Sequence, residues 1–164
     1  RYQNVFGPGQ SLKNPYTGII SIFSTQIKNG NNINIFEDGL ESRDFVYIDD
    51  VVKATILGIE KDEANYEVFN VGSGEQTTVL QVAETLREYY NAHVEIKVTG
   101  NFRLGDIRHN FADLAKSKNK LSFSPDFNFQ KGVKIFVDWV NAQEVQEDNY
   151  SKSIEEMKAK GLFK

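Results

Sequence analysis

The sequence predicts an α/β fold, in which short strands alternate with helices along a chain of 164 residues. Three observations support this class. Apolar and polar residues alternate in short runs such as residues 94–98, as they do in half-buried strands. Other runs, such as residues 19–27, repeat their apolar positions with the period of a helix face. Glycine, proline and asparagine fall between the two kinds of run, where turns are expected.

The first part of the chain is predicted to hold three strands and two helices. The strands are expected at residues 1–6, 33–36 and 43–48, and the helices at residues 19–27 and from Asp49 or Asp50 to about Lys61. The first strand stops at a Gly-Pro-Gly turn, and Asn29-Gly30 should end the first helix as a left-handed cap. The turn at residues 37–39 predicts a hairpin between the second and third strands. Asp49 or Asp50 is expected to cap the second helix.

The second part continues the alternation. Strands are expected at residues 66–71 and 94–98, and helices from Thr77 or Thr78 to Tyr90, at residues 113–121, from Phe129 or Gln130 to about Gln146, and at residues 153–160. Residues 101–106 are expected to be a loop. Gly72-Ser73-Gly74 follows a strand and precedes a helix, so it could hold a phosphate. Because no third glycine follows in register, a tight strand-to-helix turn is the favoured interpretation.

Composition argues against several classes of protein. The formal net charge of −4 argues against a nucleic-acid partner. Cysteine is absent, and the two histidines, His93 and His109, are too few for a histidine-rich site, so no metal is expected. No apolar run approaches ~20 residues and no signal peptide is visible, so we expect a cytoplasmic protein without a membrane span.

Two arginines are candidates for binding an anion. Arg43 stands at the start of a strand, and Arg103 lies in a loop with a glycine and Asp106. The planar guanidinium fork suits diphosphate oxygens because it donates parallel hydrogen bonds, and a carboxylate suits ribose hydroxyls. The alternative is that these are ordinary surface ion pairs, of Arg43 with Asp44 or Glu41 and of Arg103 with Asp106.

Asn34 and Phe36 occupy alternate positions of a predicted strand and should share one face. An amide and an aromatic ring on one face could hydrogen-bond and stack a base. The alternative is that Phe36 lies in the core and Asn34 in solvent.

Four segments, in the same order, resemble motifs of the extended short-chain dehydrogenase/reductases. Residues 1–10, R-Y-Q-N-V-F-G-P-G-Q, resemble R-Y-x-N-V-x-G-P-x-Q, and residues 38–51 resemble D-G-x-x-x-R-D-F-V-Y-V-x-D-V. Residues 69–74 resemble F-N-V-G-x-G, and residues 103–116 resemble R-x-G-D-x-x-x-x-x-A-D-x-x-K. Within that family the chain is most similar to the nucleotide-sugar epimerase/dehydratase group, of the UDP-glucose 4-epimerase type.

The resemblance implies the C-terminal part of a Rossmann-like enzyme with a small mixed α/β substrate-binding domain. Residues 1–164 would form this substrate-binding portion, and residues of about 1–10 and 44–74 would add elements to the dinucleotide-binding sheet. The family's site residues carry over by position: Tyr2 and Val5 line the nicotinamide of NAD, Asn4 contacts the nucleotide-sugar diphosphate, Asn34 and Phe36 cradle the base, Arg43 and Arg103 clamp the diphosphate, and Asp106 binds the ribose.

In this family the glycine-rich dinucleotide loop and the catalytic Tyr-x-x-x-Lys with its Ser/Thr partner lie upstream of the segment where this chain begins. The resemblance therefore implies that NAD is bound mainly by a missing N-terminal part, that no catalytic residue lies in this chain, and that the chain alone is inactive. The intact protein is expected to be a homodimeric NAD-dependent nucleotide-sugar epimerase. The alternatives are a nucleotide-sugar 4,6-dehydratase or reductase of the same family, or a non-catalytic module that binds nucleotide sugars.

Overall fold

The structure is a computed structural model that describes residues 1–16 and 18–164, and it confirms the predicted α/β class. The helices are α1 (Ile19–Lys28), α2 (Ile48–Glu60), α3 (Val79–Tyr89), α4 (Ala115–Leu121), α5 (Phe129–Asn141), α6 (Tyr150–Ala159) and a 3₁₀ turn, η1 (Asp62–Ala64). The strands are β1 (Asn4–Phe6), β2 (Ile33–Ile35), β3 (Ser42–Arg43), β4 (Phe45–Tyr47), β5 (Thr77–Thr78), β6 (Ile96–Val98) and β7 (His109–Asn110).

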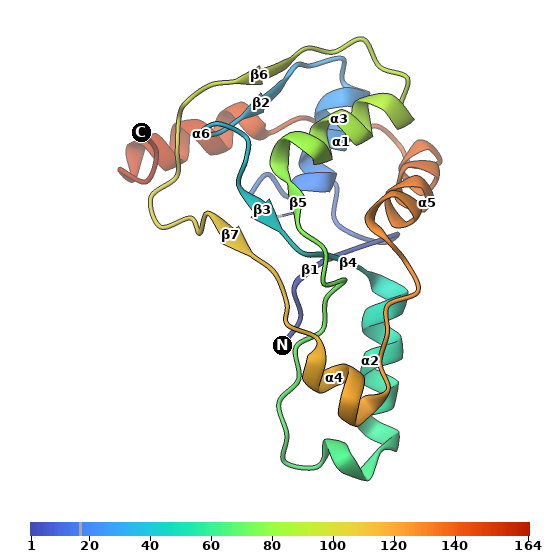
Figure 1. Ribbon diagram of the computed structural model, residues 1–164. Helices are drawn as coiled ribbons and strands as arrows, with labels where there is room; N and C mark the ends of the chain where they lie inside the picture. Colours follow the sequence, from blue (N-terminus) through green and yellow to red (C-terminus); the bar gives the residue numbers. More distant parts are fainter. Residues whose placement is uncertain (17) are drawn as a thin grey trace.

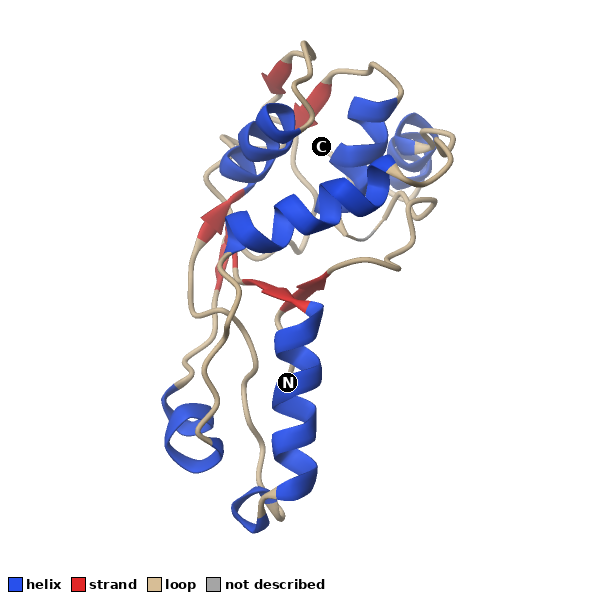
Figure 2. Cartoon of the chain, turned by 90° about the vertical axis from the view of Figure 1, so that its right-hand side faces the viewer, coloured by secondary structure: helices blue, strands red, loops and turns tan. Residues whose placement is uncertain are grey.

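The elements form a body and an arm (Figure 1). Helices α1, α3, α5 and α6 and most of the strands make up the body, while α2 and α4 extend from it as the arm. The view turned by 90° shows the same division, with α2 running away from the body (Figure 2). Among the described residues, no helix is both long enough and apolar enough to cross a bilayer.

The strands pair in small separate sheets. β1 lies parallel to β4, with Asn4 opposite Phe45, and β2 lies parallel to β6, with Ile33 opposite Ile96. β3 lies between β5, which is antiparallel to it, and β7, which is parallel to it. The body's core is an apolar cluster enclosed by α1, α3 and α5 and these strands; its fully buried members include Ile20, Ile33, Ile35, Val82, Leu86, Val133 and Phe136.

The predicted hairpin between residues 33–36 and 43–48 is wrong. β2 pairs with β6, which comes some sixty residues later, and β3 pairs with β5 and β7. The turn between them is present, since Glu37 and Gly39 have φ angles of 45° and 77°. It carries the chain from one sheet to another, because a turn signal is local and does not specify a strand's partner.

The structure confirms some of the other predicted boundaries and corrects the rest. Gly30, with φ of 72°, ends α1 as predicted, and its N–H donates to the Ile27 carbonyl at 2.9 Å. Thr78 caps α3 as predicted, in a reciprocal capping box with Gln81. The predicted strand at residues 66–71 is absent from the structure except for a single bridge between Val71 and Tyr2. Helix α5 ends at Asn141, short of the predicted boundary, and α6 starts at Tyr150, before it.

The predicted cap by Asp49 or Asp50 is also wrong. Helix α2 begins at Ile48, and its N-cap residue, Tyr47, makes no capping hydrogen bond with its side chain. The Asp50 carboxylate instead accepts hydrogen bonds from the backbone N–H groups of Asp126 and Phe127, at 2.8 and 3.1 Å. Asp50 therefore joins the arm to the segment before α5, and burial raises the pKa of its carboxyl.

Asp44, between β3 and β4, is fully buried and holds several distant segments together. Its carboxylate accepts hydrogen bonds from Ser73 N at 2.6 Å, Ser73 Oγ at 2.7 Å, Gly74 N at 2.9 Å and Ala112 N at 3.1 Å. A Cβ atom on Gly72 would lie 2.3 Å from the same carboxylate, so the turn needs glycine there. The turn at residues 72–74 thus uses its N–H groups on the chain's own carboxylate, which agrees with its interpretation as a tight turn.

We predict that Asp44→Ala lowers the free energy of unfolding by about 3–5 kcal/mol, because it leaves the backbone N–H groups of Ser73, Gly74 and Ala112 without acceptors. Urea denaturation followed by circular dichroism measures this. The matched control, Asp138→Ala, removes an exposed carboxylate from α5 and should change stability by less than about 0.5 kcal/mol. Equal stability of the two variants would contradict the role assigned to Asp44.

Candidate functional site

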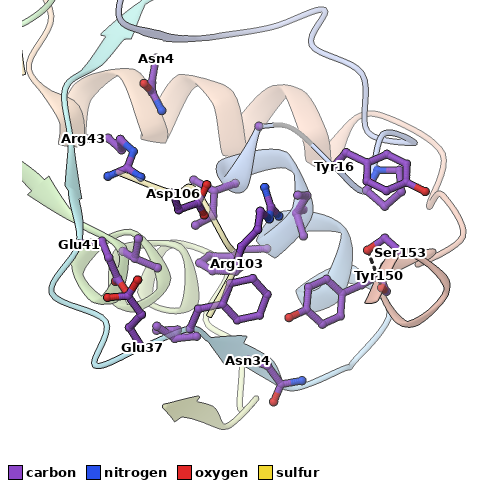
Figure 3. Close-up of a pocket in the computed structure, with 18 of the residues that line it drawn as sticks. Asn4, Tyr16, Asn34, Glu37, Glu41, Arg43, Arg103, Asp106, Tyr150 and Ser153 are labelled. Atoms are coloured by element: carbon purple, nitrogen blue, oxygen red, sulfur yellow. Dashed lines mark hydrogen bonds between the residues drawn. The ribbon is translucent and has the colours of Figure 1, made fainter. Parts of the chain in front are cut away.

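A cavity of about 240 Å³ lies in the body, between α1, β2, the loop at residues 101–106 and α6 (Figure 3). Its lining includes the six residues predicted to bind substrate: Asn4, Asn34, Phe36, Arg43, Arg103 and Asp106. They come from segments spread over a hundred positions of the sequence. The fold therefore brings these side chains to one place, although their roles remain predictions.

Arg43 enters the cavity from β3. Its Nη1 atom donates to the carbonyl oxygens of Ser42 at 2.8 Å and Arg108 at 3.2 Å, which fixes the direction of the guanidinium. The side chain has no carboxylate within ion-pair distance in the described part of the chain, so the alternative pairing with Asp44 or Glu41 is not formed. The remaining N–H groups of the fork are free to meet an anion.

Arg103 approaches from the loop at residues 101–106, and the chain's last residues hold this loop. Phe102 N donates to Lys164 O at 2.8 Å, Lys164 N to Phe102 O at 3.0 Å, and Leu104 N to Leu162 O at 3.0 Å. The Nε atom of Arg103 is buried and makes no hydrogen bond to any described residue. Asp106 meets Arg103 through its backbone N–H, which donates to the Arg103 carbonyl at 3.3 Å, rather than through an ion pair.

Asn34 and Phe36 line the cavity from β2 and the residue that follows it, on the same side as the loop that carries Arg103. Phe36 is half-buried, and its ring meets that of Phe163 edge to face, with 5.2 Å between the centroids. Figure 3 shows Asn34 below Arg103, with its amide turned away from both arginines. Asn34 and Phe36 lie beside the cavity, whereas Ile33 and Ile35 are buried in the core. This arrangement follows the predicted alternation along β2.

Tyr2 and Val5 do not line this cavity. The Tyr2 hydroxyl lies 2.9 Å from Thr55 Oγ1, and the residue is 56% exposed. Val5 packs on the smaller apolar cluster of the arm, which includes Val46 and Val51. The two predicted cofactor residues are therefore outside this cavity, although Val5 lines a second, adjoining pocket together with Asn4.

Several cavity residues were not predicted. Tyr150, Ser153 and Met157 of α6, together with Tyr16, form the side of the cavity near the chain's end. Burial raises the pKa of Tyr150 to about 12. No role is predicted for α6 from sequence, because nothing in the apolar pattern of residues 150–159 shows that this helix borders the cavity.

Glu37 and Glu41 also line the cavity. Glu41 could have been found, because it stands two residues before Arg43 on the same strand-like run and so shares its face. The carboxylates of Glu37, Asp38 and Glu41 approach one another closely. Arg108 pairs with two of them, at 2.9 Å to Glu37 and 2.6 Å to Asp38, so this group carries its own cation.

The sequence of the chain is similar to those of known enzymes. The family model described as "NAD dependent epimerase/dehydratase family" matches residues 1–72. A dTDP-L-rhamnose 4-epimerase of Burkholderia thailandensis is 40% identical over 149 residues, which cover 91% of this chain and 40% of that protein. The chain belongs to the NAD dependent epimerase/dehydratase family.

Solved structures of epimerases share its fold. The UDP-glucose 4-epimerase of Thermotoga maritima, solved with UDP-glucose, is 38% identical with a TM-score of 0.75, over 86% of this chain and 44% of that one. The UDP-N-acetylglucosamine 4-epimerase of Methanobrevibacter ruminantium, in complex with UDP-N-acetylmuramic acid, is 36% identical with a TM-score of 0.79, over 88% and 46%. The chain thus spans less than half the length of these relatives.

We predict that Phe163→Ala loosens the loop that carries Arg103, because the ring's contact with Phe36 helps to hold the chain's end in place. An aromatic pair contributes about 0.5–1.5 kcal/mol, so amide exchange at Phe102 and Leu104 should quicken roughly two- to tenfold. Hydrogen exchange followed by NMR measures both amides. Phe111→Ala, which removes an exposed ring elsewhere, is the control. Unchanged exchange at both amides in Phe163→Ala would refute the coupling.

Proposed function

We propose that this chain is the substrate-binding portion of an NAD-dependent nucleotide-sugar 4-epimerase. The observation that carries the proposal is the convergence of Arg43 and Arg103 on one cavity with no carboxylate paired to either among the described residues. Two unpaired guanidinium forks beside one cavity favour a ligand with two negative phosphate groups. The names of the relatives support a sugar nucleotide as that ligand.

The remaining residues would bind the two ends of the ligand. Asn34 and Phe36 would hold the base, Asp106 would accept from the ribose, and Asn4 would contact the diphosphate beside Arg43. Binding at several points fixes the sugar in one orientation, which is the contribution that positioning makes to catalysis. This part of the reaction is what the chain's own residues would supply.

NAD, when bound, supplies a group that can accept a hydride and return it. In this structure the Tyr2 ring is largely exposed just before β1, and Val5, within β1, is half-buried. An aromatic ring and an apolar side chain are groups that can pack against a flat ring such as nicotinamide. We propose that they contribute one edge of the nicotinamide site, while the rest of the cofactor site lies outside the 164 residues.

Epimerisation is favoured over the other reactions of the family by the relatives themselves. The proteins at 40%, 38% and 36% identity are described as 4-epimerases. A UDP-N-acetyl-alpha-D-glucosaminuronate decarboxylase of Bacillus cytotoxicus is 27% identical. Decarboxylation is the second candidate. Arg43 and Arg103 would bind the diphosphate in either reaction, because the groups that distinguish epimerisation from decarboxylation act on the sugar.

We predict that Arg43→Ala and Arg103→Ala each weaken UDP binding by about 1.5–3 kcal/mol, or roughly 10- to 150-fold, since each removes a charge-assisted pair. Isothermal titration calorimetry on the purified chain measures the affinity. Arg87→Ala, on α3 and away from the cavity, is the charge-matched control and should bind UDP like the unmodified chain. Affinities unchanged in both cavity variants would count against the diphosphate role.

We also predict that the purified 164-residue chain shows no epimerase turnover with UDP-glucose and added NAD. Nowhere in the chain is a tyrosine followed four positions later by lysine, so the family's acid/base pair is absent. A coupled assay for UDP-galactose is the measurement. Turnover above that of a boiled sample would overturn the assignment of catalysis to residues outside the chain.

A further inference from the structure

Glu41 is an unsatisfied acidic group inside the candidate site. The residue is 6% exposed, and apart from the adjacent Glu37 carboxyl no side chain or backbone group of another described residue pairs with its carboxyl group. A buried polar group without a partner is costly, and native structures rarely keep one without a use. Because Glu41 also lines the cavity, the missing partner can come from a bound ligand.

The backbone fixes where this carboxyl group points. The Glu41 carbonyl accepts a hydrogen bond from Val79 N at 2.9 Å, which anchors the residue to the start of α3. Glu41 and Arg43 are two positions apart and project from the same stretch of chain toward the cavity (Figure 3). Glu37, which follows Phe36, is its other neighbour. Glu41 therefore stands between the wall proposed to hold the base and the arginine proposed to hold the diphosphate.

The local charges favour a neutral hydroxyl over a cation as the partner. Arg108 already pairs with Glu37 and Asp38, so a metal ion would compete with an internal guanidinium for two of the three carboxylates. Burial raises the pKa of the Glu41 carboxyl, and the charges of Glu37 and Asp38 raise it further. A carboxyl group in such surroundings serves as a hydrogen-bond partner for a hydroxyl group.

We propose that Glu41 binds the 2′-hydroxyl of the ligand's ribose and makes the cavity select ribonucleoside diphosphates over 2′-deoxyribonucleoside diphosphates. The ribose joins the base to the diphosphate, and its C2′ adjoins the carbon that bears the base, which matches the place of Glu41 beside Glu37 and Phe36. This inference rests on the proposed function. It predicts a nucleotide preference different from that of the dTDP-L-rhamnose 4-epimerase relative, whose named nucleotide lacks that hydroxyl.

The test compares UDP, dUDP and dTDP by calorimetry on the 164-residue chain. UDP and dUDP differ only in the 2′-hydroxyl, and dTDP adds the 5-methyl group, which separates the two features. We expect the chain to bind UDP at least about tenfold more tightly than dUDP, as a hydrogen bond to a buried carboxyl group warrants. Glu41→Ala should lower UDP affinity to the level of dUDP and abolish the difference. Glu41→Gln keeps an acceptor oxygen and should retain part of it.

Glu84→Ala, on α3 and outside the cavity, is the matched control and should keep the preference for UDP. Equal affinity of the unmodified chain for UDP and dUDP overturns the inference but leaves the proposed function standing, and needs no variant that might fail to fold. An equal loss of affinity for UDP and dUDP in Glu41→Ala also overturns the inference. Glu41 would then act elsewhere, for instance by sharing a proton with Glu37. Failure of every nucleoside diphosphate to bind overturns the proposed function as well.

Discussion

The buried carboxylate of Asp44 is the constraint on which the cavity depends. Its side chain binds the turn at residues 73–74 and the backbone of Ala112, and its own N–H donates to Asn110 O at 3.0 Å. Its carbonyl accepts from Asn4 N at 3.0 Å. Asp44 thus fixes β1, β3, β4 and the segment that follows β7. Because Arg43 is its immediate neighbour, the same interactions fix the wall from which that arginine enters the cavity.

The wall of the cavity that carries Arg103 is held by different interactions, which involve the last residues of the chain. The last residues pair with the loop that carries Arg103, and Phe163 rests its edge on Phe36. Helix α6 is tied to the segment before α1 by a hydrogen bond between the Tyr16 hydroxyl and Glu156. The two arginines therefore come from walls of different construction. The wall that carries Arg43 is held by the buried carboxylate of Asp44. The wall that carries Arg103 is held by backbone pairing between the loop at residues 101–106 and the last residues of the chain. This pairing is more exposed to water and more easily opened.

The sequence predicted what depends on local chemistry. The strand and helix alternation, the glycine cap of α1 and the threonine cap of α3 follow from neighbouring residues, and the structure confirms them. The hairpin failed because strand pairing depends on the partners available in three dimensions: β2 found β6. Asp50 failed as a cap because a distant segment, residues 126–127, supplied competing donors.

The candidate site likewise contains residues that the sequence predicts and residues that it does not. The resemblance to a known family pointed to Arg43 and Arg103, and the structure places both at one cavity. From sequence, Glu41 is expected only as a surface partner for Arg43, because the contact with the start of α3 that accompanies its burial is not local. The contribution of α6 was missed for a related reason. A helix that borders a cavity carries the same apolar pattern as any other surface helix.

A crystal structure of this chain with UDP is the sharpest test of the proposed diphosphate site. We expect the diphosphate to lie in the cavity, with phosphate oxygens within about 3.2 Å of guanidinium nitrogens of both Arg43 and Arg103. UDP bound outside the cavity, or with its phosphates in contact with neither arginine, would contradict it.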